Sequence, residues 1–305
     1  MEDYPAPDPR SLTNYLSQAY LPPLILDIDL PQVEQYAPAW PRIPELDTPY
    51  TRYIQRIRPI PLGKLQDAVR TYFAGFGRRF RIDWDNAPPA LPCPGIVTLG
   101  SFAMGRLVIN NESDFYAALE FFVLDTAAEI VRTIERPPSE HLHHFRCVHI
   151  DSARHHKEVW RVYSIGPFIP PVGHLRPGMV VLAIPPWELG LGDLGDFTYT
   201  HRYGERQLDK DIGPRHWSNS DKVWAMLYDS CRVSGYRWFA VTNYKYWVFG
   251  TFSLRWNAAE VTEPLPFDLT RDMTIIEMLT FWLECSRNQS KCWEFAVDAP
   301  SGVEH

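Results

Sequence analysis

The sequence predicts an α+β or α/β domain in which a central mixed sheet is flanked by helices. Residues 111–136 repeat apolar side chains with the period of a helix, and residues 145–184 hold three strand-like runs separated by loops. From residue 220 onward a helix, two strands and a last helix are predicted in that order. Helices and strands that alternate in this way pack as layers around one sheet.

The helix from residue 111 is predicted from its ends as well as from its apolar stripe. Asn111 is a good N-cap, and Glu112 and Asp114 suit the positive end of the helix dipole. Pro137 ends the pattern because proline cannot continue a helix. Glu112 and Asp114 can therefore be capping residues or an acidic pair at a site, and capping is favoured.

Two later helices are predicted in the same way. Residues 220–235 predict one that is capped by Ser220 and ended by Gly235, which readily adopts the left-handed conformation of a helix end. Residues 272–288 predict the last helix from a broad apolar face. The strands are predicted at residues 145–151, 158–166, 179–184, 236–243 and 245–253.

The stretch "VVLAIPPWELG", Val180–Gly190, predicts a buried strand with an abrupt end. The strand stops near Ile184 because neither of the two prolines that follow can donate to a sheet ladder. Trp187 and Glu188 are then presented at its tip. Around this core, residues 1–109 predict a proline-rich extension that packs on residues 110–290, and residues 291–305 predict a tail.

The composition excludes several classes of protein. The chain has 305 residues and a formal net charge of −7, which disfavours binding of duplex nucleic acid through a broad basic face. Five scattered cysteines without a CxxC pair, and an N-terminus unlike a signal peptide, predict an intracellular protein, cytoplasmic or nuclear. No apolar run approaches the roughly 18 residues of a membrane span.

Two segments carry a resemblance to a known family. The element order, the stretch "PPWELGLGDLGDF" and the hairpin "TNYKYWVFGTFS", Thr242–Ser253, resemble the restriction-endonuclease-like PD-(D/E)XK fold. They are similar in particular to a degenerate form found in proteins of mushroom-forming fungi. The resemblance covers roughly residues 110–290 and implies a nuclease-like core.

The family's metal-dependent chemistry is not expected from these residues. Such nucleases hold a divalent metal with an Asp on one strand and a Glu-x-Lys on the next, often with a Glu from the first helix. Leu182 and Ile184 stand where that Glu and Lys belong, and residues 161–178 contain no Asp. Only Glu112 or Asp114 matches, so a divalent metal is not expected at the nuclease-type site. Whether the chain uses a cofactor is left unknown.

A second possible site is rich in histidine. The stretch "HLHHFRCVHIDSARHH", residues 141–156, places His141, His143 and His149 where they can alternate onto one strand face. Imidazole suits zinc or copper, but the spacing is untidy and solvated surface histidines are the simpler interpretation.

The remaining candidates are acid–base groups and aromatic side chains. In "KEVWRVYSI" Arg161 and Tyr163 share one strand face, which can be the old cleft or an exposed sheet face. Residues 195–217 predict a long polar loop that can be a lid or a plain connection. The catalytic candidates are Glu112, Asp114, Arg161, Tyr163, Glu188 and His201, and the ligand-binding candidates are Trp187, Trp217, Lys222 and Trp224.

Three functions stay open at this stage. The first is a degenerate nuclease-fold protein that binds a protein or a small apolar ligand in the old cleft, and the sequence slightly favours it. The second is a repurposed enzyme acting on a small, largely apolar metabolite, for which a deep pocket with a carboxyl of raised pKa would be evidence. The third is a metal-binding protein that uses the histidine cluster. Whether the chain is an enzyme is therefore left undecided.

Overall fold

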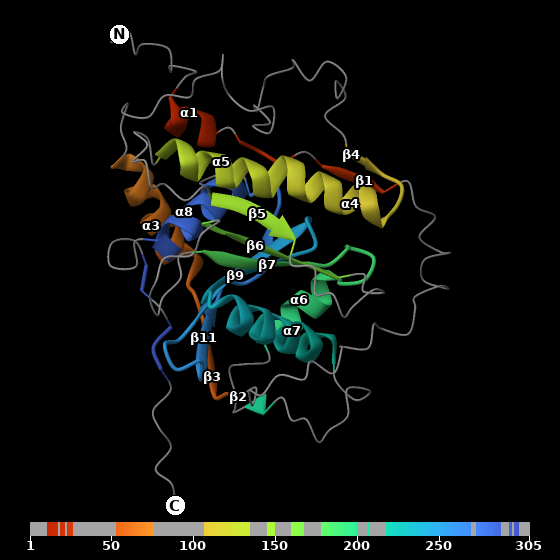
Figure 1. Cartoon of the computed structure of the whole chain (residues 1–305), viewed down its shortest axis with the longest axis vertical. Helices are drawn as coiled ribbons and strands as arrows, with labels where there is room; N and C mark the ends of the chain where they lie inside the picture. Colours follow the sequence, from red (N-terminus) through yellow and green to blue (C-terminus); the bar gives the residue numbers. More distant parts are fainter. Residues whose placement is uncertain are drawn as a thin grey trace, which may run out of the picture.

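The structure is a computed structural model (Figure 1). It describes residues 11–17, 19–21, 23–26, 53–75, 107–134, 145–149, 160–167, 178–199, 206–207, 218–269, 273–287, 293–294 and 296–298. Within these ranges the architecture is a mixed sheet with helices on both faces, the α+β class predicted from the sequence.

The central sheet has eight strands in the order β3-β11-β10-β9-β7-β6-β5, with β12 paired to β10 at the side. β7 and β9 are parallel neighbours, whereas β5 with β6, β6 with β7, and β9 with β10 are antiparallel. The strands span Arg56–Pro59 (β3), Phe145–His149 (β5), Arg161–Pro167 (β6), Met179–Ala183 (β7), Trp238–Thr242 (β9), Tyr246–Phe252 (β10), Ala258–Val261 (β11) and Leu265–Pro266 (β12).

Alternate side chains along each strand enter different cores. On β7, Val181 and Ala183 belong to one core, while Val180 and Leu182 belong to the other. β6 alternates in the same way, because Tyr163 lies in the first core and Val162 in the second. All five residues of β7 are buried, so both faces of this strand must be apolar.

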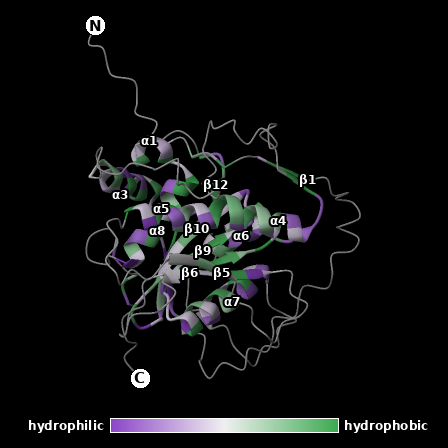
Figure 2. Ribbon diagram, turned by 45° about the horizontal axis from the view of Figure 1, so that its top comes forward, coloured by the Kyte–Doolittle hydropathy of each residue, from purple (hydrophilic) through white to green (hydrophobic). Residues whose placement is uncertain are grey.

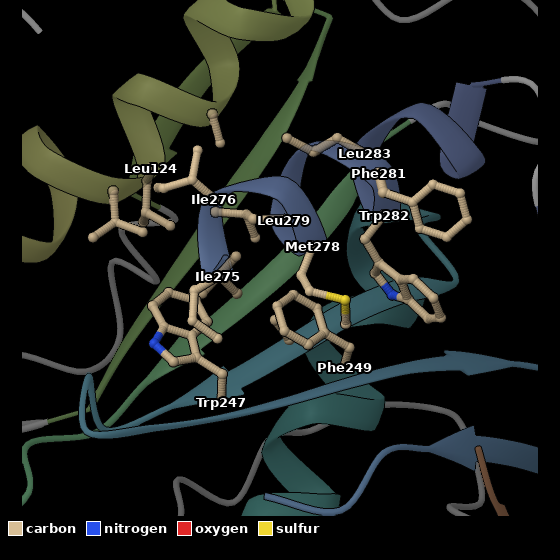
Figure 3. Packing of buried hydrophobic residues seen from close by; sticks show 14 of the residues in the cluster. Leu124, Trp247, Phe249, Ile275, Ile276, Met278, Leu279, Phe281, Trp282 and Leu283 are labelled. Carbon is tan, nitrogen blue, oxygen red and sulfur yellow. The ribbon is translucent and has the colours of Figure 1, made fainter. Parts of the chain in front are cut away.

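The first core lies beneath a layer of helices on one face of the sheet (Figure 1). α4 (Glu112–Leu119), a π-helical turn (Glu120–Leu124) and α5 (Asp125–Ile134) run on as one long helix. α8 (Ile275–Arg287) lies between this helix and the strands, and Figure 3 shows its Ile275, Met278 and Trp282 above Trp247 and Phe249 of β10. α1 (Leu12–Leu16) and α3 (Leu62–Ala74) complete the layer.

The second core lies beneath α6 (Leu191–Tyr199) and α7 (Asn219–Ser234) on the opposite face. Figure 2 shows hydrophobic residues along the central strands and a mixture of hydrophilic and hydrophobic residues along α4, α5 and α7. This division is what an amphipathic helix packed on a buried sheet requires.

The N-terminal segments are part of the same structure. β3 adds a parallel strand beside β11, and α3 packs on α8. β1 (Leu24–Leu26) pairs in parallel with β4 (Leu107–Ile109), and β2 (Tyr53–Ile54) pairs with β8 (Arg206–Gln207). The described part of residues 1–109 therefore extends the sheet and covers one helical layer.

Several local expectations need correction. The N-cap of α7 is Ser218, which forms a capping box with Asp221, whereas the predicted cap Ser220 is buried inside the helix. Residues 195–199 belong to α6 and are not part of a loop. Asn111 and Gly235 cap their helices as predicted. The Asn111 side chain accepts a hydrogen bond from the Asp114 backbone N–H at the start of α4, and Gly235 has a φ of 73° at the end of α7.

Replacing Gly250 with alanine should destabilise the fold. A Cβ atom at Gly250 of β10 would come within 2.7 Å of the Glu260 carbonyl oxygen and would overlap the Phe239 ring. Overpacking of this kind typically costs about 1–3 kcal/mol. We expect urea denaturation to show such a loss for Gly250→Ala, and little change for Gly63→Ala, where a Cβ meets no atom within 4 Å. Equal stability of the two variants would contradict this packing.

Replacing Tyr72 with phenylalanine tests how α3 is held on the core. The Tyr72 hydroxyl donates to the Glu284 carboxylate across 2.9 Å, and Arg287 also pairs with Glu284, which is 2% exposed. Loss of a hydrogen bond to a buried charged group costs about 1.5–3 kcal/mol. Tyr72→Phe should lose roughly that free energy of unfolding in a denaturant titration, while Tyr20→Phe at an exposed position should lose almost none.

Candidate functional site

Three elements meet where β7 ends: the start of β6, the turn after β7, and the first two turns of α4. Arg161 is the register partner of Ala183, so the beginning of β6 lies beside the end of β7. The Tyr116 hydroxyl of α4 reaches the Ala183 carbonyl oxygen at 3.4 Å. We call the cluster formed here the β7 tip site; its residues are Glu112, Phe115, Tyr116, Trp160, Arg161, Trp187 and Glu188.

The turn after β7 is held at both ends. The Ile184 amide donates to the Thr242 carbonyl of β9, which keeps the end of β7 paired in the sheet. The Glu188 and Leu189 amides both donate to the Pro185 carbonyl, at 2.9 and 3.1 Å. The Asn243 side chain donates to the Leu189 carbonyl at 2.8 Å. Trp187 and Glu188 therefore project from a fixed turn rather than from an open loop.

Glu188 is the most perturbed carboxyl group of the site. The indole Nε1 of Trp160 donates to its Oε2 at 3.0 Å. Burial raises the pKa of Glu188 to about 7, since desolvation outweighs the hydrogen bond from Trp160, and the charge of Glu112 adds to the increase. This carboxyl group therefore exchanges its proton near neutral pH.

Glu112 and Arg161 complete the charged part of the site. The pKa of Glu112 is raised by burial, and the positive charge of Arg161 partly offsets the effect. The Arg161 guanidinium lies 4.2 Å from the centroid of the Tyr116 ring, in a cation–π contact. In the part of the chain that the structure describes, Arg161 forms no ion pair with Glu112 or Glu188.

Aromatic rings form a continuous wall beside these charges. Trp187 packs edge-on against Phe115 at 5.9 Å, and Phe115 packs edge-on against Tyr116 at 5.0 Å. Tyr163 lies next along β6 and is fully buried. Burial raises the pKa of both Tyr116 and Tyr163, so the two phenols stay neutral and serve as polar but uncharged groups.

The arrangement offers a proton donor or acceptor, a second carboxyl group and a guanidinium next to an apolar wall. These are the groups that small-molecule sites use, namely a few convergent polar atoms on a largely apolar surface. A carboxyl group whose pKa lies near 7 can also act as a general acid or base.

The structure brings together four of the predicted candidates: Glu112, Arg161, Trp187 and Glu188. Tyr163 borders them. Asp114 instead closes the N-terminus of α4, where hydrogen bonds from Asn110 and Asn111 lower its pKa.

Two predicted ligand-binding residues lie apart from the β7 tip site. Trp224 is fully buried in the second core, where it stacks on Phe197 at 4.4 Å and donates to the Phe197 carbonyl oxygen. Lys222 lies in the first turns of α7, and burial lowers its pKa. A common aromatic wall of Trp187 and Trp224 does not form, because the two residues belong to cores on opposite faces of the sheet.

Other candidates fall outside the described residues. These are His201, Trp217, His141 and His143, while only the backbone of His149 in β5 is described. Within the described ranges, no three His, Cys, Asp or Glu side chains gather closely enough to hold a metal ion. Metal binding by the histidine cluster stays a prediction.

The sequence analysis missed three residues of the site, Phe115, Tyr116 and Trp160. Tyr116 follows Glu112 by four residues, so the two share one helix face, and this spacing was a usable signal. For Trp160 no local signal existed, because its partner Glu188 is 28 residues away.

The structure also places Leu182 and Ile184, the residues that the sequence resemblance aligns with the Glu and Lys of the nuclease motif. Leu182 and Ile184 are fully buried in the second core, beneath α6 and α7. Glu112 and Tyr116 stand on α4, which covers the opposite face. The two residues that the resemblance aligns with that Glu and Lys therefore do not face Glu112.

The chain matches no family model, no curated protein and no solved structure. Of the helices that the structure describes, none combines the length and the apolar character needed to cross a membrane.

Replacing Glu188 with glutamine should stabilise the fold at high pH more than at low pH. An unfolded glutamate ionises near its usual pKa of 4.5, whereas folded Glu188 ionises near 7. The wild-type protein therefore loses stability as the pH rises between these values. The Glu188→Gln variant does not, because its side chain has no acidic proton and can still accept the hydrogen bond from Trp160. Each pKa unit corresponds to about 1.4 kcal/mol, which solvent screening of this partly exposed group reduces to an expected gain of about 1–2 kcal/mol.

The measurement is the free energy of unfolding of both proteins at pH 5 and pH 8. Asp114→Asn is the matched control: the native pKa of Asp114 is lowered from its usual 3.8, so this group is ionised in both states at pH 5 and pH 8, and the effect of its replacement should be the same at the two pH values. A Glu188→Gln difference that does not grow with pH would show that Glu188 ionises normally.

Proposed function

We propose that the β7 tip site binds a small, largely apolar ligand, on a restriction-endonuclease-like core that has lost the metal-dependent nuclease motif. The observation that carries the proposal is Glu188, held at 3.0 Å by the Trp160 indole and only partly exposed, beside Glu112 and Arg161. Groups of this kind are costly to bury, and structures retain them chiefly where they contact something.

The nuclease-like part of the proposal rests on element order. A helix (α4 to α5), three neighbouring strands (β5, β6 and β7), a helix (α7) and the adjoining strand β9 come in the order of the resemblance, with α6 and β8 inserted between β7 and α7. The apolar residues Leu182 and Ile184 support a site without nuclease chemistry. Of the described cysteines, Cys147 and Cys231 are free thiols, which is compatible with the predicted intracellular location.

A second candidate function is acid–base catalysis on the same small molecule. A general acid or base works best when its pKa lies near the working pH, and Glu188, with a pKa of about 7, meets this condition. The second carboxyl group, Glu112, and the cation Arg161 are then available to orient a substrate. A bell-shaped or sigmoidal pH profile of turnover that disappears in Glu188→Gln is the result that favours this function.

The test is a thermal-shift screen of the purified chain with a library of small metabolites. A ligand present at about a hundred times its Kd should stabilise the fold by about 2.7 kcal/mol. We expect a hit whose shift is lost in Glu188→Gln and in Trp187→Ala. The shift should be kept in Val233→Ala, which changes an exposed residue at the end of α7. A hit whose shift survives both site variants, or a complete absence of hits, would overturn the proposal in favour of a protein partner.

A further inference from the structure

We infer that the ligand of the β7 tip site is a cation, an amine whose ammonium group binds between the Glu112 and Glu188 carboxylates. The inference rests on the proposed function, because it names the chemical class of the ligand at the same site. It follows from the charges that face one another there and from the contacts that those charges already make.

The charged and titratable groups around Glu188 come from two elements. α4 contributes Glu112 and Tyr116, and β6 contributes Arg161 and Tyr163. The two phenols stay neutral, so Arg161 supplies the positive charge that must balance two carboxylates. The site carries an excess of one negative charge when both glutamates are ionised.

Arg161 does not remove this excess from Glu188. Its guanidinium is placed over the Tyr116 ring, at 4.2 Å from the centroid, and its field favours the ionised form of Glu112. Within the described structure, the Trp160 indole is the group that favours the ionised form of Glu188, and this indole is a neutral donor. Among the described groups no cation offsets the burial that raises the pKa of Glu188 to about 7, so this carboxyl group is partly protonated at neutral pH.

An ammonium group can replace that proton. It brings one positive charge and three N–H donors, so it balances the excess negative charge of the site and can donate hydrogen bonds to both carboxylates. An anionic ligand would meet the two carboxyl groups as like charges, and a neutral ligand would leave the excess charge in place. The charge balance therefore selects the amine.

The aromatic wall fits the same class of ligand. Trp187 is half-buried and packs edge-on against Phe115, and the indole is the ring that attracts cations most strongly. An amine with an apolar body can place its carbon atoms on this wall while its nitrogen reaches the carboxylates.

The experiment uses sets of probes that share an apolar body and carry a cationic, a neutral or an anionic head group. Benzylamine, benzyl alcohol and benzoate form one set, and 2-phenylethylamine, 2-phenylethanol and phenylacetate form a second. Aliphatic sets with hexyl and cyclohexyl bodies complete the panel. Binding to the full chain is measured by thermal shift and by calorimetry from pH 5.5 to pH 8, a range over which the amines stay ionised.

We expect the amines to bind and their uncharged and anionic counterparts to bind at least tenfold more weakly. Amine affinity should increase with pH, approaching tenfold per pH unit while Glu188 is protonated, because binding releases that proton. In calorimetry, the released proton gives a binding enthalpy that depends on the buffer.

The variants separate charge from structure. Glu188→Gln should bind amines at least tenfold more weakly and with a flat pH profile, and Glu112→Gln should weaken binding while it keeps the slope. Arg161→Gln removes a competing cation and should strengthen amine binding. Val233→Ala should leave both the amine affinity and its dependence on pH unchanged.

Each other outcome identifies what has failed. If alcohols or carboxylates bind as tightly as amines at this site, the charge inference is wrong and the small-ligand site stands. If the amines bind with the same affinity at all pH values, or equally well to Glu188→Gln, the ammonium does not replace the Glu188 proton and the inference is wrong. If neither this panel nor the metabolite library gives a site-dependent shift, the proposed small-ligand function itself has failed.

Discussion

The burial of β7 on both faces is the constraint on which the rest of the structure depends. Its five residues lie between β6 and β9, with the helices α4, α5 and α8 on one face and α6 and α7 on the other. A strand in this position can carry only apolar side chains, because a polar group there would lose its water without gaining a partner. Along this segment polar side chains can therefore follow only where the strand stops, and two prolines fix that point.

The β7 tip site follows from this geometry. The turn after Pro185 turns Trp187 and Glu188 toward α4 and β6, where the Trp160 indole and the Arg161 guanidinium lie. Partial burial strengthens every electrostatic interaction among these groups and at the same time penalises each charge. The raised pKa values of Glu112 and Glu188 and the neutral phenols of Tyr116 and Tyr163 are results of the same desolvation.

Local sequence signals predicted the elements well where neighbouring residues decide the structure. The N-cap of α4 depends on Asn111 and Asp114, which are three positions apart, and the left-handed end of α7 depends on Gly235 alone. The sequence signals failed where the deciding contact is distant. α6 was hidden by Gly192 and Gly195, which weaken helix propensity, and its stability comes from packing on α7. β3 and β11 form a ladder between residues about two hundred positions apart, which no local pattern encodes.

The sequence by itself determined the apolar character of β7 on both of its faces and the end of this strand at Pro185. These are properties of side-chain type and order, and they hold in any arrangement of the chain. Only the tertiary structure decided which candidates meet. Trp187 and Trp224 gave similar signals, yet one borders the site and the other fills the opposite core, since strand register and helix docking assign each side chain to a face. The raised pKa of Glu188 could likewise not be predicted from the sequence, because desolvation depends on atoms brought together from three separate segments.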